Sequence, residues 1–461
     1  MSKSSKTNNI SQEISEKFQL SRVNKSIFEA CTNNAQLSSF GGIALLREEE
    51  SYLALSSQLA SCITDRRTKY LVKHSLEGLL MTRIFQICLG YQDVNDCDRM
   101  RKEALMQLAV HEGDFDRDIC SSATMCRFEN SVTEEDLLAI QEMFVTMFIL
   151  SYKGKEPSHI ILDCDDTNVD AYGAQEGILF NSYYDSYCYM PLLVFEGYSG
   201  KMILPLLKPG RRNKAADVCD TLQWLIETLR AAWPHTTIIV RGDSHFCSGD
   251  FMDWVTGTMQ PKVHFITGLA NNSRLLSDPK VTALCEKVKR LYSLWNHPVK
   301  EYESLYYKAD RWQFGHRVIV KVEMTKAGGE LNIRFIITNM RKNDARGLYE
   351  TTYCGRGRDE LFIRQFKEGV NGDRLSCHTF KANRLRIFIH AAAYVLMHSL
   401  RERALKRTEM EYASLLTIRE RLLLMAVSVR RLKNKIIIDY PKFNPVIDVL
   451  RHALEFYGKV A

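Results

Sequence analysis

Two isoleucine-rich segments that each end in aspartate constrain the fold of this chain more than any other feature. One reads Ile-Ile-Leu-Asp-Cys-Asp-Asp-Thr over residues 160–167, and the other reads Ile-Ile-Val-Arg-Gly-Asp-Ser over residues 238–244. Side chains alternate along a strand, so Asp163 and Asp165 share one face. Packing explains these acids poorly, because an unpaired buried carboxylate is costly. Strand ends in α/β sheets gather ligands and metals, although an aspartate there can also cap the following turn or helix.

The region around these segments is predicted to alternate strand and helix. Residues 189–196 and 201–207 read as two strands joined by a turn that contains two glycines. An amphipathic helix is expected from about residue 214 to 233, followed by strands at 236–243 and 263–269. A meander of strands followed by helix–strand units is typical of an α/β core built on a mixed sheet.

The flanking regions differ in pattern from this core. Residues 18–150 carry apolar side chains at helical spacing and show no convincing strand. Residues 271–340 look like a β-rich insertion, with strand candidates at 302–307, 317–324 and 332–339. After Arg346 the pattern is helical again.

Composition argues against a membrane protein and against a disulfide-bonded secreted protein. Apolar runs such as 143–150 and 422–429 are far shorter than the roughly 18 residues that cross a bilayer. Residues 1–17 are polar and lack the apolar stretch of a signal peptide. The 13 cysteines form no Cys-x-x-Cys pair, and many lie in apolar segments. This pattern favours buried free thiols in a reducing cytoplasm over disulfides or a zinc site.

Positive charge gathers towards the end of the chain. The formal net charge is +7, and residues 401–461 hold 13 Lys and Arg against 7 Asp and Glu, a balance of +6. Such a cluster suits a polyanion partner such as DNA, and a solvated helical surface explains it equally well.

A third element follows the two aspartate segments. Tyr353, Arg356, Glu360 and Lys367 have the spacing Y-x2-R-x3-E-x6-K. On a regular helix, where each residue turns by about 100°, all four would lie within an arc of roughly 60°. The plain alternative is a surface helix with an i,i+4 ion pair between Arg356 and Glu360. Glycines beside Arg356 lower helix propensity, so we expect the helix to begin near Arg358.

With this spacing the chain resembles the DDE transposases of bacterial insertion sequences, in the group that carries the Y-R-E-K signature. The first aspartate segment resembles the family's Asp-x-Thr, which selects Asp165, with Asp163 and Asp166 as alternative first ligands. Asp243 falls in the segment that resembles the second aspartate motif, where His245 replaces a frequent glycine. Residues 173–192 resemble the stretch that follows the first motif.

The resemblance implies a catalytic and metal-binding triad of Asp165, Asp243 and Glu360. Breaking a phosphodiester builds charge on both the attacking and the leaving oxygen, and two divalent ions about 4 Å apart can stabilise both. Carboxylate ligands without a His/Cys set favour Mg²⁺, or Mn²⁺, over zinc.

The other signature residues are expected to contact DNA. Arg356 and Lys367 would hold a phosphate on the same face as Glu360, and Tyr353 would bind a phosphate or stack on a base. Trp295 and Trp312 of the insertion are further candidates for stacking on a flipped base, although aromatics in a small β region are more often core.

The pattern predicts an α/β mixed-sheet core, which the resemblance implies is an RNase H-like catalytic core, with a β-rich insertion, a helical N-terminal DNA-binding region and a basic C-terminal helical region. The expected segments are a disordered lead-in (1–17), a helical DNA-binding and dimerisation region (18–150), the first part of the core (151–270), the β-rich insertion (271–340), the second part of the core with the Glu helix (341–400) and the basic region (401–461).

Recognition of terminal inverted repeats requires a module that reads DNA sequence. Residues 120–130 read as a short helix opened by Ser121 or Ser122. Arg127 and Asn130 on such a helix could enter a major groove, as in a helix-turn-helix, and the alternative is a plain helical bundle. The C-terminal cations Arg430, Arg431, Lys433 and Lys435 offer nonspecific phosphate contacts.

The function expected from the resemblance is metal-dependent cleavage at insertion-sequence ends and strand transfer into target DNA. The protein would act as a homodimer on paired double-stranded ends, in the bacterial cytoplasm at the nucleoid and without a membrane partner. Two alternatives remain, a stand-alone metal-dependent nuclease and an inactive or repurposed sequence-specific DNA-binding protein. Retention of all three acids weighs against the inactive form.

Overall fold

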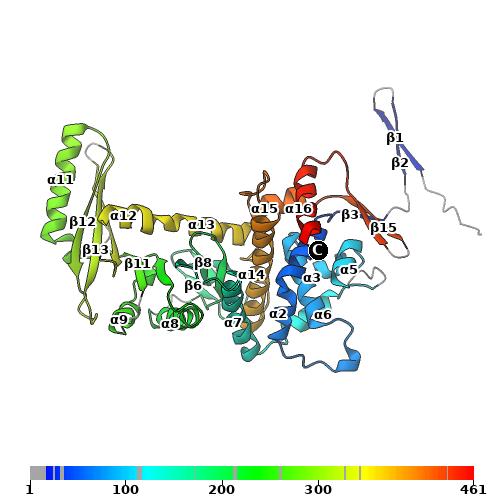
Figure 1. The fold of residues 1–461 in the computed structure, drawn as a ribbon, viewed down its shortest axis with the longest axis horizontal. Helices are drawn as coiled ribbons and strands as arrows, with labels where there is room; N and C mark the ends of the chain where they lie inside the picture. Colours follow the sequence, from blue (N-terminus) through cyan, green and yellow to red (C-terminus); the bar gives the residue numbers. More distant parts are fainter. Residues whose placement is uncertain are drawn as a thin grey trace, which may run out of the picture.

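A computed structural model describes most of the 461-residue chain. The described residues are 17–23, 26–31, 36–111, 117–171, 173–210, 215–258, 262–326, 329–341, 344–432 and 435–460. Residues 1–16 of the predicted lead-in (1–17) and the basic residue Lys433 lie outside them, whereas Lys17 is the first residue of a strand. The described part is elongated, with a large sheet on one side of a long central helix and a helical region on the other (Figure 1).

An eight-stranded mixed sheet forms the centre of the fold, in the order β12-β13-β14-β11-β10-β4-β8-β9. Its three middle strands β4, β10 and β11 run parallel, and the other neighbours are antiparallel. The strands are β4 (His159–Asp166), β8 (Leu192–Glu196), β9 (Met202–Leu206), β10 (Thr237–Gly242), β11 (Val263–Leu269), β12 (Val299–Tyr307), β13 (His316–Met324) and β14 (Asn332–Thr338).

The side chains of β4 alternate between a face that packs in the apolar core and a face that carries aspartates. Ile160, Leu162 and Cys164 are buried in the apolar cluster that also holds the buried side chains of α8 (Ala215–Ala232) and α9 (Gly249–Gly257). Asp163 and Asp165 point to the opposite face. The parallel pairing of β4 with β10 brings the ends of both strands to the same edge of the sheet.

Helix α14 (Phe380–Arg403) joins the sheet to the helical region. Most of its side chains are buried, because it contacts β9 and α7, which also contact each other, and in addition α1 and α3. The helices before the sheet are α1 (Ile43–Leu53), α2 (Leu55–Ser61), α3 (Leu76–Cys88), α4 (Asp96–Arg99), α5 (Ala104–Val110), α6 (Ser122–Glu129) and α7 (Glu134–Leu150).

The insertion differs from the predicted β-rich piece. Its three strands form where they were expected, but β14 pairs with β11, so they extend the core sheet. It also begins with α10 (Ser273–Leu276) and α11 (Pro279–Trp295). Asp278 and Pro279 begin α11 at its N-cap and N1 positions, and its buried residues Val281, Leu284 and Val288 lie at helical spacing.

Two regions predicted to be mainly helical also contain strands. Residues 18–150 include a hairpin of β1 (Lys17–Val23) and β2 (Ser26–Cys31), and the short β3 (Leu37–Ser38). In the basic C-terminal region, β15 (Val427–Leu432) and β16 (Lys435–Asp439) form a hairpin that adds β3 as a third strand. Pairing with β3, nearly 400 residues earlier, is a tertiary contact that local periodicity does not reveal.

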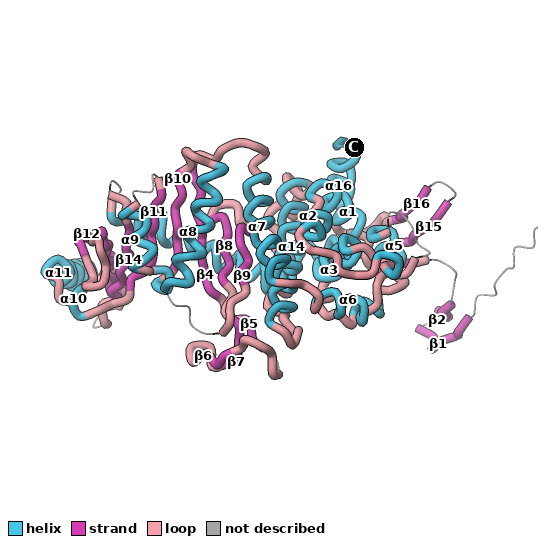
Figure 2. The backbone as a smooth tube through the Cα atoms, turned by 90° about the horizontal axis from the view of Figure 1, so that it is seen from below, coloured by secondary structure: helices cyan, strands magenta, loops and turns pink. Residues whose placement is uncertain are grey.

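The remaining elements lie at the margins of the sheet and at the end of the chain. A three-stranded sheet of β5 (Val169–Asp170), β7 (Ser186–Tyr189) and β6 (Leu179–Asn181) stands out beside β4 and β9 (Figure 2). The last helices are α12 (Ala345–Gly347), α13 (Gly357–Arg364), α15 (Leu415–Ile418) and α16 (Ile447–Val460). Among the described helices, we find none with the length and hydropathy of a membrane span.

Candidate active site

Asp165 and Asp243 lie at the same edge of the sheet. Asp165 is the last residue but one of β4, and Asp243 directly follows the end of β10. Asp243 accepts a hydrogen bond from the backbone N–H of His245 at 2.8 Å, which fixes the turn after β10. Burial raises the pKa of Asp165 to about 7, and the charges of Asp243 and Asp166 add to the rise. The two carboxylates are therefore electrostatic neighbours that favour a compensating positive charge.

The neighbouring acids Asp163 and Asp166 are occupied by other partners. Arg241 donates from Nε and Nη2 to the two oxygens of Asp163, each at 2.5 Å, and both side chains are almost fully buried. Its Nη1 donates to the carbonyl oxygen of Thr352 at 2.6 Å. Asp166 pairs with Lys208 at 2.7 Å. Asp165 has a looser partner, Nη1 of Arg356 at 3.4 Å.

Three of the four signature residues reach this edge. Arg356 contacts Asp165, and Nζ of Lys367 donates to the backbone oxygen of Asn168 at 2.7 Å, just beyond β4. Tyr353 packs on the ring of Tyr349, with 5.6 Å between centroids, and lies close to Gly268 at the end of β11. Burial raises the pKa of the Tyr353 hydroxyl and lowers that of Lys367.

The signature segment is helical but irregular. A π-helical turn covers Leu348–Tyr353, a 3₁₀ turn covers Cys354–Arg356, α13 begins at Gly357, and a second π turn covers Gln365–Gly369. The regular helix therefore starts one residue before the expected Arg358. π turns inside helices are frequent at functional sites.

Glu360 and its neighbour Asp359 point in different directions. Glu360 is exposed, and within the described residues it is not gathered with Asp165 and Asp243 into a group that could hold a metal. Asp359 is fully buried, and neither of its carboxylate oxygens has a hydrogen-bond partner. Burial raises the pKa of Asp359 to about 9, helped by the charges of Asp163 and Asp165, so this side chain is protonated at neutral pH. The sequence gave no signal for Asp359 beyond its place next to Glu360.

On a regular helix, Glu360 would share a face with Arg356 and Lys367, and this is the arrangement that the spacing of the signature predicts. At about 100° per residue, Glu360 lies about 40° from Arg356, whereas Asp359 lies about 60° away on the other side. The face that carries Arg356 and Lys367 is the one that contacts Asp165 and Asn168.

The donor set of this edge suits a hard divalent cation. In the described part of the chain, no group of three His, Cys, Asp or Glu side chains is already arranged to hold a metal. The two aspartates supply carboxylate oxygens, and the cysteine nearest to them in sequence, Cys164, is buried on the other face of β4. Two adjacent carboxylates that offer oxygen ligands match Mg²⁺ or Mn²⁺ better than zinc.

The predicted DNA-reading helix forms, but away from this edge. Ser121 caps α6 by accepting from the backbone N–H of Thr124, which settles the choice between Ser121 and Ser122. Figure 1 places α6 on the side of α14 opposite to the sheet. Arg127 is exposed, whereas Asn130 donates to the Cys126 carbonyl at 2.9 Å and accepts from Thr379 at 3.3 Å.

A buried ion network holds α6 in the bundle. Glu129 accepts from Nε of Arg83 at 3.1 Å and from Nε of Arg386 at 2.9 Å, and all three side chains are buried. The opposite face of α6, with Arg127, stays open to solvent.

The two tryptophans of the insertion have different surroundings. Trp312 packs on Tyr307, with 5.6 Å between centroids, and against the insertion's apolar cluster, as expected for a core residue. Trp295 is half exposed at the end of α11, where it stacks on His297.

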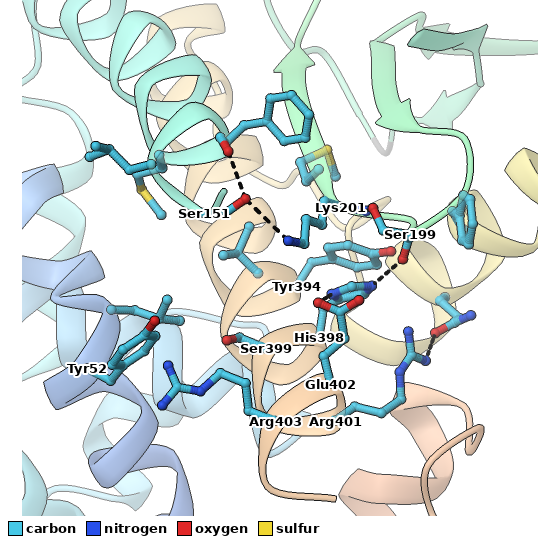
Figure 3. Close-up of a pocket in the computed structure, with 18 of the residues that line it drawn as sticks. Tyr52, Ser151, Ser199, Lys201, Tyr394, His398, Ser399, Arg401, Glu402 and Arg403 are labelled. Carbon is cyan, nitrogen blue, oxygen red and sulfur yellow. Dashed lines mark hydrogen bonds and ion pairs between the residues drawn. The ribbon is translucent and has the colours of Figure 1, made fainter. Parts of the chain in front are cut away.

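A cavity of about 950 Å³ lies apart from the carboxylates. It opens between the C-terminal half of α14, the ends of α1 and α7, and the turn between β8 and β9 (Figure 3). That turn is opposite the start of β4, whereas Asp165 is at its end. His398 is fixed there by the carbonyl of Ser199 at 2.9 Å, and burial lowers its pKa to about 3. No motif in the sequence pointed to this cavity.

Comparison with known proteins gives an extensive family match and weak structural likenesses. The family model described as "Transposase DDE domain group 1" matches residues 21–459. No curated protein sequence matches the chain significantly. Among solved structures, the cryo-EM structure of a piggyBac transposase synaptic complex with hairpin DNA is similar at 10% sequence identity and a TM-score of 0.42. That likeness covers 83% of this chain and 79% of the piggyBac chain.

Proposed function

The chain belongs to the family Transposase DDE domain group 1, and we propose on that premise that it cuts DNA at insertion-sequence ends and joins those ends to target DNA. The observation that carries this proposal is the meeting of Asp165 and Asp243 at one sheet edge, with Arg356 beside them. Two carboxylates from adjacent parallel strands and a cation form a setting suited to a phosphodiester.

The proposed metal ligands are Asp165, Asp243 and Glu360. A bound Mg²⁺ or Mn²⁺ would supply a Lewis acid for the phosphate and lower the pKa of the attacking water or 3′-hydroxyl. Glu360 is preferred to Asp359 because, on a regular helix, it would share the face of Arg356 and Lys367. The buried carboxyl of Asp359 lies within electrostatic reach of both Asp163 and Asp165 and is neutral.

The basic signature residues would position the DNA strand. The guanidinium of Arg356 is half-buried at the carboxylate edge and suits a bidentate contact with a phosphate. Lys367 is held beside Asn168 and would add a second positive charge, while Tyr353 would contact a neighbouring phosphate or base. These residues fix the strand so that its scissile phosphate lies at Asp165 and Asp243.

Reading of the terminal repeats is assigned to α6, and the active form is proposed to be a dimer on paired ends. Arg127, on the exposed face of α6, is the leading base-contacting residue, with Asn130 at the end of the helix. Because Asn130 already contacts Thr379, the alanine substitution at Arg127 should weaken specific binding more than that at Asn130.

The test is cleavage of a labelled duplex that carries the sequence flanking the gene. Wild type should nick at the element boundary with Mg²⁺ and not with EDTA. Asp165→Asn and Glu360→Gln should each lower the rate at least about a hundredfold, since each removes a metal ligand. Asp359→Asn is the matched control on the same helix, and it should retain most of the activity because it replaces a neutral buried carboxyl.

The outcomes separate the assignments. Loss of cleavage in Asp359→Asn with an active Glu360→Gln would move the third ligand to Asp359. Specific DNA binding without cleavage by folded wild type would replace the transposase proposal with a repurposed DNA-binding protein. Cleavage without any strand transfer into target DNA would leave a nuclease.

A further inference from the structure

An exposed group of aromatic side chains is carried by the small sheet of β5, β7 and β6, which stands out beside the end of β4 (Figure 2). The sheet lies next to the carboxylates because β5 starts at Val169, four residues after Asp165, and pairs with β7. We call it the aromatic tip, and it consists of Phe180, Tyr183, Tyr184 and Tyr187, which are 52%, 86%, 36% and 59% exposed.

The rings of the tip support one another. Phe180 and Tyr187 meet edge to face with 5.5 Å between centroids, and Tyr183 and Tyr184 do so at 4.9 Å. The turn between them is ordered by a hydrogen bond from the backbone N–H of Tyr183 to Asn181, at 3.0 Å. The rings are thus held in place while their faces remain open.

The base of the small sheet is anchored to the body of the protein. The hydroxyl of Tyr189 donates to the carbonyl of Glu176 at 2.7 Å and accepts from Asn383 of α14 at 3.1 Å. Glu176 in turn accepts from the backbone N–H of Phe380 at 2.9 Å. The tip is therefore a preformed feature at a fixed place relative to the catalytic edge.

Its surroundings favour nucleic acid as the partner. The pairing of β5 with β7 brings Tyr187 of β7 to the end of β4, and partial burial with the charges of Asp165 and Asp166 also raises the pKa of Tyr184. Lys208, which pairs with Asp166, and Lys367, which donates to the backbone of Asn168, stand along the same edge. A DNA strand whose phosphate rests at Asp165 must pass near this tip, where its bases meet exposed rings.

We propose that the aromatic tip is a stacking platform for unpaired bases next to the scissile phosphate, an inference that rests on the proposed function. Every base has an aromatic face, so such a platform tolerates sequence. It would hold nucleotides that are unstacked or flipped when the strand is drawn towards Asp165 and Asp243. This moves the stacking role expected of Trp312, which is packed, to the tyrosines of the tip.

The experiment measures stacking separately from cleavage. The probe is a duplex with a short single-stranded overhang that contains the fluorescent base 2-aminopurine, bound to Asp165→Asn protein so that no cutting occurs. The test variant in this background is Tyr183→Ala/Tyr187→Ala, and Tyr183→Phe/Tyr187→Phe keeps the rings. Tyr70→Ala is the matched control, because Tyr70 is also 86% exposed but belongs to the helical region.

The alanine pair should relieve the quenching of the overhang and weaken its binding at least about fivefold, since a stacked base contributes that much or more to affinity. The phenylalanine pair and Tyr70→Ala should behave like the parent, and binding of a blunt duplex should change little. In the active background, the alanine pair should slow cleavage without moving the cut.

Unchanged quenching and affinity in the alanine pair would overturn the platform, as would a loss of self-association with intact overhang binding. If the wild type never cuts DNA, the proposed function is refuted. If the alanine pair cuts DNA as fast as the wild type does, this inference alone is refuted.

Discussion

Replacing Arg241 with methionine should destabilise the protein strongly while leaving Asp165 and Asp243 in place. Asp163 is fully buried and accepts both of its hydrogen bonds from Arg241, so the substitution strands a carboxylate in the interior. Removing one partner of a buried ion pair costs about 3–5 kcal/mol. The lost hydrogen bond to Thr352 adds about 1 kcal/mol, which favours the upper end of that range.

The loss should depend on pH in a defined direction. Burial raises the pKa of Asp163 above its usual value, and Arg241 is the main influence that lowers it. Without Arg241 the folded-state pKa rises further, so folded protein keeps a proton that unfolded protein releases. Stability of the variant is therefore lost as pH rises above the unfolded pKa. The difference from wild type should be smaller near pH 5 than near pH 8.

Urea unfolding of Arg241→Met, Asp163→Leu and the double variant forms the assay. The double variant should recover most of the stability, because an apolar pair replaces the ion pair without leaving a charge. Asp165→Asn, by contrast, should leave stability unchanged or slightly raised, since Asp165 lies among like charges. A loss under about 1 kcal/mol in Arg241→Met, or no recovery in the double variant, would refute this account of Asp163 as a structural residue.

Three further predictions concern the scaffold. Glu129→Ala leaves two buried arginines without their shared carboxylate and should cost about 3–5 kcal/mol in urea unfolding, whereas Glu134→Ala, which removes a partly exposed pair, should cost under about 1 kcal/mol. Gly200→Ala should destabilise the protein more than Gly154→Ala. Both glycines have a positive φ, which costs alanine about 1–2 kcal/mol at either position. Only at Gly200 does the added methyl group meet Phe362, at 2.6 Å, and this clash adds about 1–3 kcal/mol. Burial lowers the pKa of His390 to about 3, so the folded protein resists protonation of this side chain. The free energy of unfolding should therefore fall as the pH drops below 6.5, by up to about 1.4 kcal/mol per pH unit. His390→Gln should reduce this slope when the free energy of unfolding is measured as a function of acid pH.

The sequence predicted correctly those features that depend on a few neighbouring residues. Alternation within residues 160–167 put Asp163 and Asp165 on one face, and β4 has that arrangement. The strands of the insertion and the cap of α6 at Ser121 are likewise local features that the sequence predicted. The assignment of the triad and of the DNA-contacting residues stays a prediction until it is tested by substitution.

The sequence pattern did not predict which strands, far apart in the chain, would pair with each other. The sequence marked the strands of the insertion but did not indicate that β14 would pair with β11 and widen the core sheet. The same holds for β15, whose partner β3 is nearly 400 residues away. Strand pairing depends on which backbone edges meet after folding, and short strands carry little information about their partners.

The sequence by itself determined the family, the aspartates at two strand ends and the spacing of the signature residues. The tertiary structure decided the partner of each charged group: Arg241 neutralises Asp163, Lys208 holds Asp166, and Asp165 is left beside Asp243. It also turned Asp359 inward and Glu360 outward. The physical reason is that residue type and spacing fix which face a side chain takes, whereas its charge partner and its burial depend on what other segments pack against that face.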